Sequence, residues 1–120
     1  MRVERSLQQK LCVDGSFMKE FVLSEPVTAD LADYLRNFGP AEILTLHGKA
    51  LLSFRIDRVI SVQGVLGEST VEVRYAAGVY ELIPDLFHLF LYHYSNGKET
   101  GKMREILSAM EGKIRGPLGC

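Results

Sequence analysis

The sequence predicts an α+β fold: a single domain whose antiparallel sheet, built from a hairpin and a meander, carries about three helices packed on one face. Two observations lead to this prediction. Apolar and polar residues alternate between positions 50 and 75, with the period of two that is typical of half-buried strands. Apolar residues recur at helical spacing before and after that region. The length of 120 residues suits one domain, which we expect to span residues 1–115, with a disordered tail at 116–120.

The first element expected is a β-hairpin. Asp14-Gly15 is a frequent two-residue hairpin turn, and SFMKEFVL after it has the composition of a strand. The preceding arm, VERSLQQKLCV, has two interpretations, because Leu7 and Leu11 also have the four-residue spacing of a helix. We expect a strand there.

A helix is expected next, over residues 26–38. Pro26 suits its first turn, and Asp30 favours the positive end of the helix dipole. Gly39, which is followed by a proline, is in the usual position for ending a helix. The apolar side chains at helical spacing are Leu31, Leu35 and Phe38.

Residues 42–76 are expected to form a meander. Gly48-Lys49 is a candidate turn after EILTLH. In the next run, ALLSFRIDRVISVQGVL, apolar residues occupy the even positions before and after Arg58. The interruption at Asp57-Arg58 predicts a bend or bulge there. These apolar residues are Leu52, Phe54, Ile56, Ile60 and Val62.

The register of the last two strands can also be predicted. A turn at residues 67–68 sets Val62 opposite Val73 and Ile60 opposite Tyr75. The apolar faces of the two strands then coincide, which is the condition that specifies a register where one face is buried.

Two helices are expected at the end of the chain. The first spans residues 84–95, with Pro84 in its first turn. The second begins near residues 99–101 and ends at 116–117, where a glycine and a proline follow each other. Its amphipathic stripe consists of Met103, Ile106, Leu107, Met110 and Ile114.

The composition argues against several classes of function. The net charge is −1, whereas nucleic-acid binding usually requires a basic excess, so we do not expect it. The N-terminus lacks the apolar segment of a signal peptide, and no apolar run could span a bilayer, so we expect a cytoplasmic protein without membrane contact and with reduced thiols. Cys12 and Cys120 form no metal-binding motif, and Cys12 would act as a nucleophile only at a helix N-terminus or beside a basic group.

The segment PDLFHLFLYHYSNG carries the candidate interface. As a helix it is apolar nearly all round, which is typical of helices buried between layers or against a partner. His88 and Tyr92 are neighbours on one side of it. We therefore expect His88, Leu91 and Tyr92 to contact a protein partner, in the first place another copy of the chain, because aromatic residues are enriched at interfaces.

Two other kinds of site remain open. A ligand pocket between helices and sheet would use His47, His88, Tyr92 and His93. An anion site at the start of the last helix would combine free backbone N–H groups with lysines; its residues would be Gly97, Lys98, Gly101 and Lys102.

No metal and no cofactor is predicted. His88 and His93 are five residues apart, about 140° around a helix, so they cannot easily reach one ion. The patterns together favour a small non-catalytic interaction module that self-associates or binds a protein partner. The alternative is a ligand-binding protein or an enzyme that uses the pocket described above. No motif identifies a reaction, a substrate or a particular partner.

Overall fold

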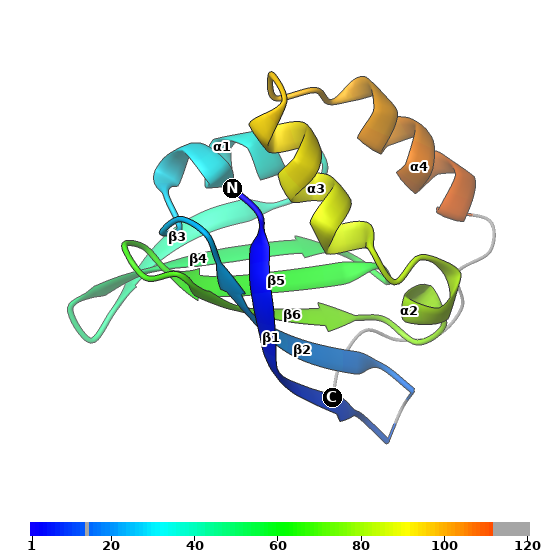
Figure 1. Cartoon of the computed structure of the whole chain (residues 1–120), viewed down its shortest axis with the longest axis horizontal. Coiled ribbons are helices and arrows are strands. Elements are labelled where there is room, and N and C mark those ends of the chain that lie inside the picture. The colour runs from blue at the N-terminus through cyan, green and yellow to red at the C-terminus, as the bar shows by residue number, and fades with distance from the viewer. Residues whose placement is uncertain (14, 112–120) are drawn as a thin grey trace.

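A six-stranded antiparallel sheet is the centre of the computed structural model, which describes residues 1–13 and 15–111. The spatial order of its strands is β1-β2-β6-β5-β4-β3. In Figure 1, α1, α3 and α4 lie above the sheet, and the described residues place no helix on the face below. The strands are β1 (Val3–Leu11), β2 (Phe17–Leu23), β3 (Ala41–Leu46), β4 (Lys49–Ile56), β5 (Ile60–Val65) and β6 (Thr70–Tyr75). The helices are α1 (Ala29–Leu35), α2 (Val79–Leu82), α3 (Leu86–Ser95) and α4 (Gly101–Glu111).

Aromatic rings join α3 to the sheet. The ring of Phe87 stacks on Phe21 of β2, with 5.6 Å between centroids. Phe90 meets Phe54 of β4 edge to face at 5.8 Å, and Phe38 after α1 at 5.2 Å. Edge-to-face and offset rings at these separations attract each other beyond their apolar burial. The core therefore lies between α3, α1 and the upper face of the sheet.

The predicted register of β5 and β6 is confirmed: Ile60 pairs with Tyr75 and Val62 pairs with Val73. The run from 50 to 66 is not one bent strand. The chain reverses at residues 57–59, where Arg58 has a φ of 64°, so that β4 and β5 pair antiparallel. The polar dipeptide that predicted a bulge therefore forms a complete turn.

The turn between β3 and β4 lies one residue earlier than predicted. Leu46 pairs with Lys49, so the two turn residues are His47 and Gly48, with φ values of 52° and 76°. Two successive positive φ values define the type I′ hairpin turn, whose twist matches that of the flanking strands. The predicted turn at Gly48-Lys49 was wrong.

The first helix is shorter than predicted. It begins after Thr28, whose Oγ1 accepts a hydrogen bond from the N–H of Leu31 at 3.3 Å, so Pro26 lies outside it. Gly39 lies against β4: a Cβ at this position would be 2.5 Å from the carbonyl oxygen of Arg55. This glycine is therefore required by a close approach of two backbones rather than by the helix end.

The N-terminal arm is a strand, as expected, and β2 also pairs with β6, so the hairpin belongs to the main sheet. The described residues contain four helices, one more than expected, because residues 79–82 form a separate turn of helix. None of the helices described is long and apolar enough to cross a membrane. Asp14 of the first turn, the predicted end of the last helix and the tail at 116–120 lie outside the described residues.

Because two tyrosines are buried, the free energy of unfolding is expected to fall at alkaline pH. The Tyr34 hydroxyl donates a hydrogen bond to the Glu99 carbonyl at 2.6 Å, and burial raises the pKa of Tyr34 to about 12 from 10.0. Burial also raises the pKa of Tyr75. The unfolded chain loses these protons first, so the free energy of unfolding should be unaffected below pH 10 and should fall between pH 10 and about 12. Urea unfolding of wild type and Tyr34→Phe should show a shallower fall in the variant; equal slopes would contradict the assignment to Tyr34.

Candidate functional site

The candidate interface on α3 is divided between the surface and the core. Tyr92 is 60% exposed and His88 is exposed, with its ring edge-on to Phe21 at 5.4 Å. Leu91 is only 1% exposed and belongs to the core beneath the helix. Because a residue buried within the monomer cannot contact a second molecule, Leu91 is removed from the expected interface.

The four residues of the expected ligand pocket are not brought together. His47 is in the β3–β4 turn, at the end of a hairpin on the edge of the sheet. His88 and Tyr92 are on the exposed side of α3, whereas His93 is buried. Among the described residues, no group of three or more His, Cys, Asp or Glu could hold a metal ion. The geometry does not support a common site for these side chains.

The expected anion site at the start of α4 is occupied by the protein itself. Glu99 Oε1 accepts hydrogen bonds from the N–H groups of Gly101 and Lys102. Lys98 Nζ donates a hydrogen bond to Asp30 Oδ1 at 2.8 Å, which lowers the pKa of Asp30 and raises that of Lys98. Three of the groups that would attract an anion are therefore bound to carboxylates of the same chain. Gly97 has a φ of 81° and serves the turn between α3 and α4.

Cys12 is not available as a nucleophile. It is 6% exposed and disulfide-bonded, whereas the sequence analysis expected reduced thiols. Cys120 lies outside the described residues. A sulfur held in a disulfide has no thiolate to attack a substrate.

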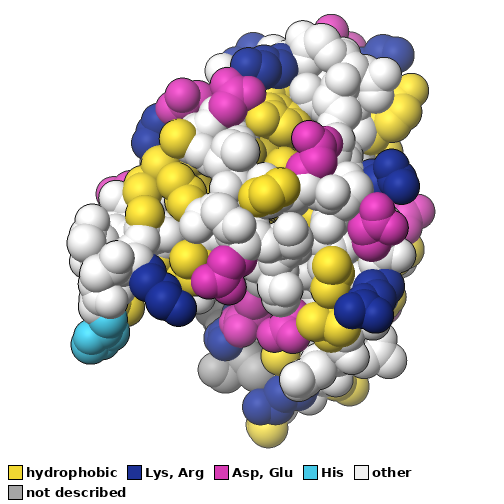
Figure 2. Space-filling view, turned by 60° about the vertical axis from the view of Figure 1, so that its left-hand side comes forward, with side chains coloured by type: hydrophobic (Ala, Val, Ile, Leu, Met, Phe, Trp, Pro, Cys, Tyr) yellow, Lys and Arg dark blue, Asp and Glu magenta, His cyan; other side chains and the backbone are white. Residues whose placement is uncertain are grey.

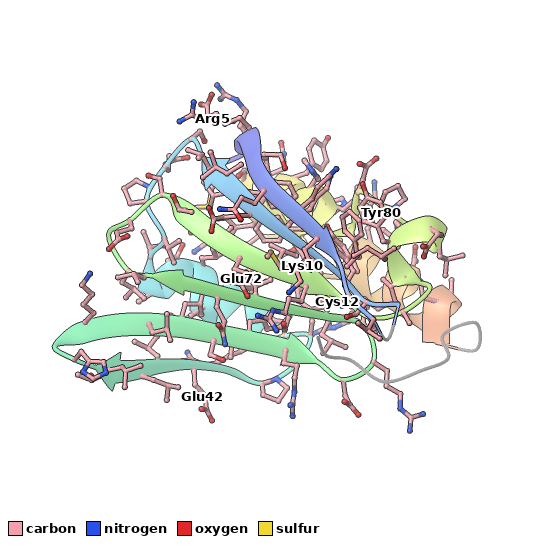
Figure 3. The ribbon with its side chains drawn as sticks, turned by 90° about the horizontal axis from the view of Figure 1, so that it is seen from below. Arg5, Lys10, Cys12, Glu42, Glu72 and Tyr80 are labelled. Atoms are coloured by element: carbon pink, nitrogen blue, oxygen red, sulfur yellow. The ribbon has the colours of Figure 1, made fainter. Side chains whose placement is uncertain are left out.

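The lower face of the sheet carries side chains in three rows that cross several strands. Figure 3 views this face, with Lys10 on β1, Glu72 on β6 and Glu42 on β3 spread across it. The strand register places three basic side chains in one row, three acidic and two amide side chains in the next, and apolar side chains in the third; the first two rows, called basic and acidic after these residues, also contain a methionine and serines. The basic row contains Lys10, Met18, Arg74, Ser61 and Arg55; the acidic row contains Gln8, Glu20, Glu72, Gln63, Ser53 and Glu42; the apolar row contains Val65, Leu51 and Leu44.

A shallow hollow of about 350 Å³ lies across the first two rows near β3. Its lining is mostly polar and includes Glu42, Arg55, Gln63 and Arg74. Arg74 Nε donates a hydrogen bond to Glu72 Oε1 at 2.7 Å, so one of its two arginines is already paired. The lining contains no histidine or cysteine, and we assign no reaction to it.

The two edges of the sheet differ in how they are protected. The outer strand β1 is interrupted by two register shifts and carries Glu4, Arg5 and Lys10. Bulges and charges are the devices by which proteins prevent edge strands from pairing with other chains. The outer strand β3 has no register shift, and it contains neither proline nor lysine. Its exposed apolar residues are Ile43 (37%), Leu44 (46%) and Leu46 (56%).

The hydrogen-bond pattern shows which groups of β3 point outward. The N–H of Arg55 donates to the Pro40 carbonyl at 3.0 Å. In an antiparallel pair, hydrogen-bonded and non-hydrogen-bonded residues alternate, so the even-numbered residues of β3 bond to β4. The N–H and C=O groups of Ala41, Ile43 and Thr45 therefore face away from the sheet. One of them is occupied, because Arg36 Nε donates to the Ala41 carbonyl at 2.8 Å.

The fold and this edge define an α+β domain with one protected and one accessible edge strand. Comparison of the chain with protein-family models, with curated proteins and with solved structures found no match in any of the three. The assignment of function therefore depends on the geometry of the accessible edge. Figure 2, which brings the β3–β4 side of the molecule forward, shows hydrophobic side chains exposed there between charged groups.

β3 was not predicted as a site, although its sequence carries a signal. EILTL places apolar side chains on both faces of the strand, at Ile43 on one face and at Leu44 and Leu46 on the other. Such a strand needs cover on both faces or a partner. The hydrogen bond from Arg36 to Ala41 leaves no trace in the sequence, because it depends on how α1 packs against β3.

Proposed function

We propose that this protein is a non-catalytic interaction module that self-associates through the β3 edge of its sheet. The observation that carries the proposal is the contrast between a β1 edge with two register shifts and three charged residues and a β3 edge with an unbroken register and a single charged residue, Glu42. An unprotected edge presents N–H and C=O groups in the spacing that another strand requires, and strand addition at such edges is a recurrent mode of protein recognition.

This proposal keeps the class of function that the sequence suggested and moves the contact from α3 to β3. Tyr92 and His88 remain exposed on α3, but a helix face offers no backbone groups for pairing because its N–H and C=O groups are bonded internally. The outward N–H and C=O groups of Ile43 and Thr45 form no hydrogen bond with any of the described residues. Their pairing with a second chain adds hydrogen bonds as well as apolar contact.

Replacing Ile43 by proline tests the proposal. The N–H of Ile43 points away from β4, so proline is tolerated there as it is on other edge strands. A two-fold pair of chains would lose two donors at about 1 kcal/mol each, and the dissociation constant should rise by at least about 30-fold. Sedimentation equilibrium over a range of concentrations measures this change.

The matched control is Ile43→Val, which keeps the N–H and a β-branched side chain and should associate like the wild type. A second control, Leu44→Pro, removes an N–H that bonds to β4 and should lower the stability of the monomer itself. A wild type that stays monomeric at every concentration contradicts the proposal. So does an Ile43→Pro variant that dimerises with unchanged affinity.

A further inference from the structure

Two features determine how two copies would pair: the rows of side chains on the lower face of the sheet, and the backbone N–H and C=O groups of β3 that form no hydrogen bond with β4. We infer that two β3 strands pair antiparallel with Leu44 of one copy directly opposite Leu44 of the other. This inference rests on the proposed self-association and specifies the register in which the two β3 strands pair. The result is a continuous sheet of both copies, with a two-fold axis perpendicular to the sheet at the Leu44 pair.

The backbone groups that are free on β3 favour this register. With Leu44 opposite its own copy, Ile43 of each chain forms a hydrogen-bonded pair with Thr45 of the other. Every outward group of these two residues is then satisfied. The Ala41 carbonyl, which accepts from Arg36 at 2.8 Å, is not needed.

The neighbouring register, with Ile43 opposite its own copy, is less favourable. It pairs Ala41 of each chain with Thr45 of the other, so the N–H of Thr45 must compete with Arg36 for the Ala41 carbonyl. Unless the Arg36 side chain is displaced, this N–H stays unbonded inside the new sheet, and unsatisfied buried donors are costly. Arg36 therefore disfavours this register.

The side chains on the lower face of the sheet favour the same register. Leu44, Leu51 and Val65 lie in one row, and pairing Leu44 with its copy joins two such rows into one apolar band across both chains. In the register centred on Ile43, Leu44 would instead face Glu42 of the other copy. In the register shifted the opposite way, centred on Thr45, Ile43 would face His47, which lies in the hairpin turn with a φ of 52°, so the outward groups of Ile43 would have no strand residue to pair with. In the register centred on Glu42, Glu42 would face its own copy, and like charges directly opposite each other are destabilising.

The inferred pairing also changes the hollow on the open face. Glu42 forms part of its lining and would lie opposite Leu46 of the second copy. An exposed leucine of one chain would therefore extend the wall of the hollow in the other. The hollow becomes a feature shared by two copies rather than one that each chain completes alone.

Single cysteine substitutions on β3 discriminate between the registers. In an antiparallel sheet, directly opposite residues of a non-hydrogen-bonded pair have Cα atoms about 4.5 Å apart, within the range of a disulfide. Leu44→Cys should therefore form a disulfide-linked dimer under mild oxidation, whereas Ile43→Cys should not, because its copy lies two positions away along the strand. Glu42→Cys and Leu46→Cys should each stay unlinked alone and should cross-link when the two variants are mixed.

Wild-type protein treated with the same oxidant controls for the native cysteines, and mass spectrometry of the digested dimer locates the new bridge. Circular dichroism checks that each variant is folded, which we expect because Leu44 is 46% exposed. Cross-linking by Ile43→Cys in place of Leu44→Cys would overturn the register and leave the proposed function standing. If no β3 cysteine cross-links although the wild type sediments as a dimer, β3 is not the contact and both proposals fail. A monomeric wild type would also end both.

Discussion

Replacing Leu91 by glutamate is expected to unfold the protein. Leu91 is 1% exposed on α3, in a core where aromatic rings of the helix contact rings of the sheet. A carboxylate at this position would lose its water without gaining a partner. We expect a loss of about 4 kcal/mol or more, which is comparable with the lower end of the roughly 5–15 kcal/mol by which ordinary domains are stable.

The adjacent position provides the control. Tyr92 is 60% exposed, so Tyr92→Glu places the same charge on the same helix in water and should change the free energy of unfolding by less than about 1 kcal/mol. Urea unfolding of both variants, followed by circular dichroism, makes the comparison. A folded Leu91→Glu variant with altered association would return Leu91 to the interface and contradict its place in the core.

Replacing Phe90 by alanine should have the second largest effect. The Phe90 side chain is fully buried and meets Phe54 of the sheet and Phe38 after α1 edge to face. It therefore joins three parts of the core, and its removal leaves a cavity that cannot collapse without moving all of them. We expect a loss of about 3–5 kcal/mol.

Leu89→Ala is the matched control for Phe90→Ala, because Leu89 is the preceding residue of the same helix and is only half-buried. It should lose about 1–2 kcal/mol. The measured quantity is the urea midpoint at an unchanged slope, since a changed slope would indicate altered compactness rather than altered stability. Equal losses in the two variants would contradict the central position of Phe90.

The segment that looked most functional in the sequence is mainly a core helix. Its buried residues Leu86, Phe87, Phe90, Leu91 and His93 lie within about 160° of its circumference at about 100° per residue. The helix therefore uses one face for the core, although its sequence is apolar nearly all round. The sequence could not separate a helix that is buried by its own domain from one that is buried by a partner, because both need the same residues. Only packing against Phe21 and Phe54 distinguishes them.

The candidate sites failed for a common reason. His47 lies in the β3–β4 turn and His93 on α3, so the two histidines belong to separate elements. Lys98 is adjacent in sequence to Glu99, whose carboxylate occupies the start of α4. Residue type and spacing describe what a local segment could do. They do not show which groups are already bonded to other parts of the same chain.

The sequence by itself determined the features that depend on residues close together in the chain, such as strand periodicity and turns. The alternation of apolar residues and the turn at 67–68 were sufficient for the pairing of Ile60 with Tyr75 and of Val62 with Val73, because a slip of one residue would expose the whole apolar set. The α+β class follows from the same periodicities.

The tertiary structure decided which surfaces remain open. The order of strands puts β1 and β3 at the edges of the sheet, and no local pattern records that order. The bond from Arg36 to the Ala41 carbonyl depends on the packing of α1 against β3. Whether an edge strand is accessible depends on which other elements pair with it or cover it, and these long-range contacts exist only in the folded structure.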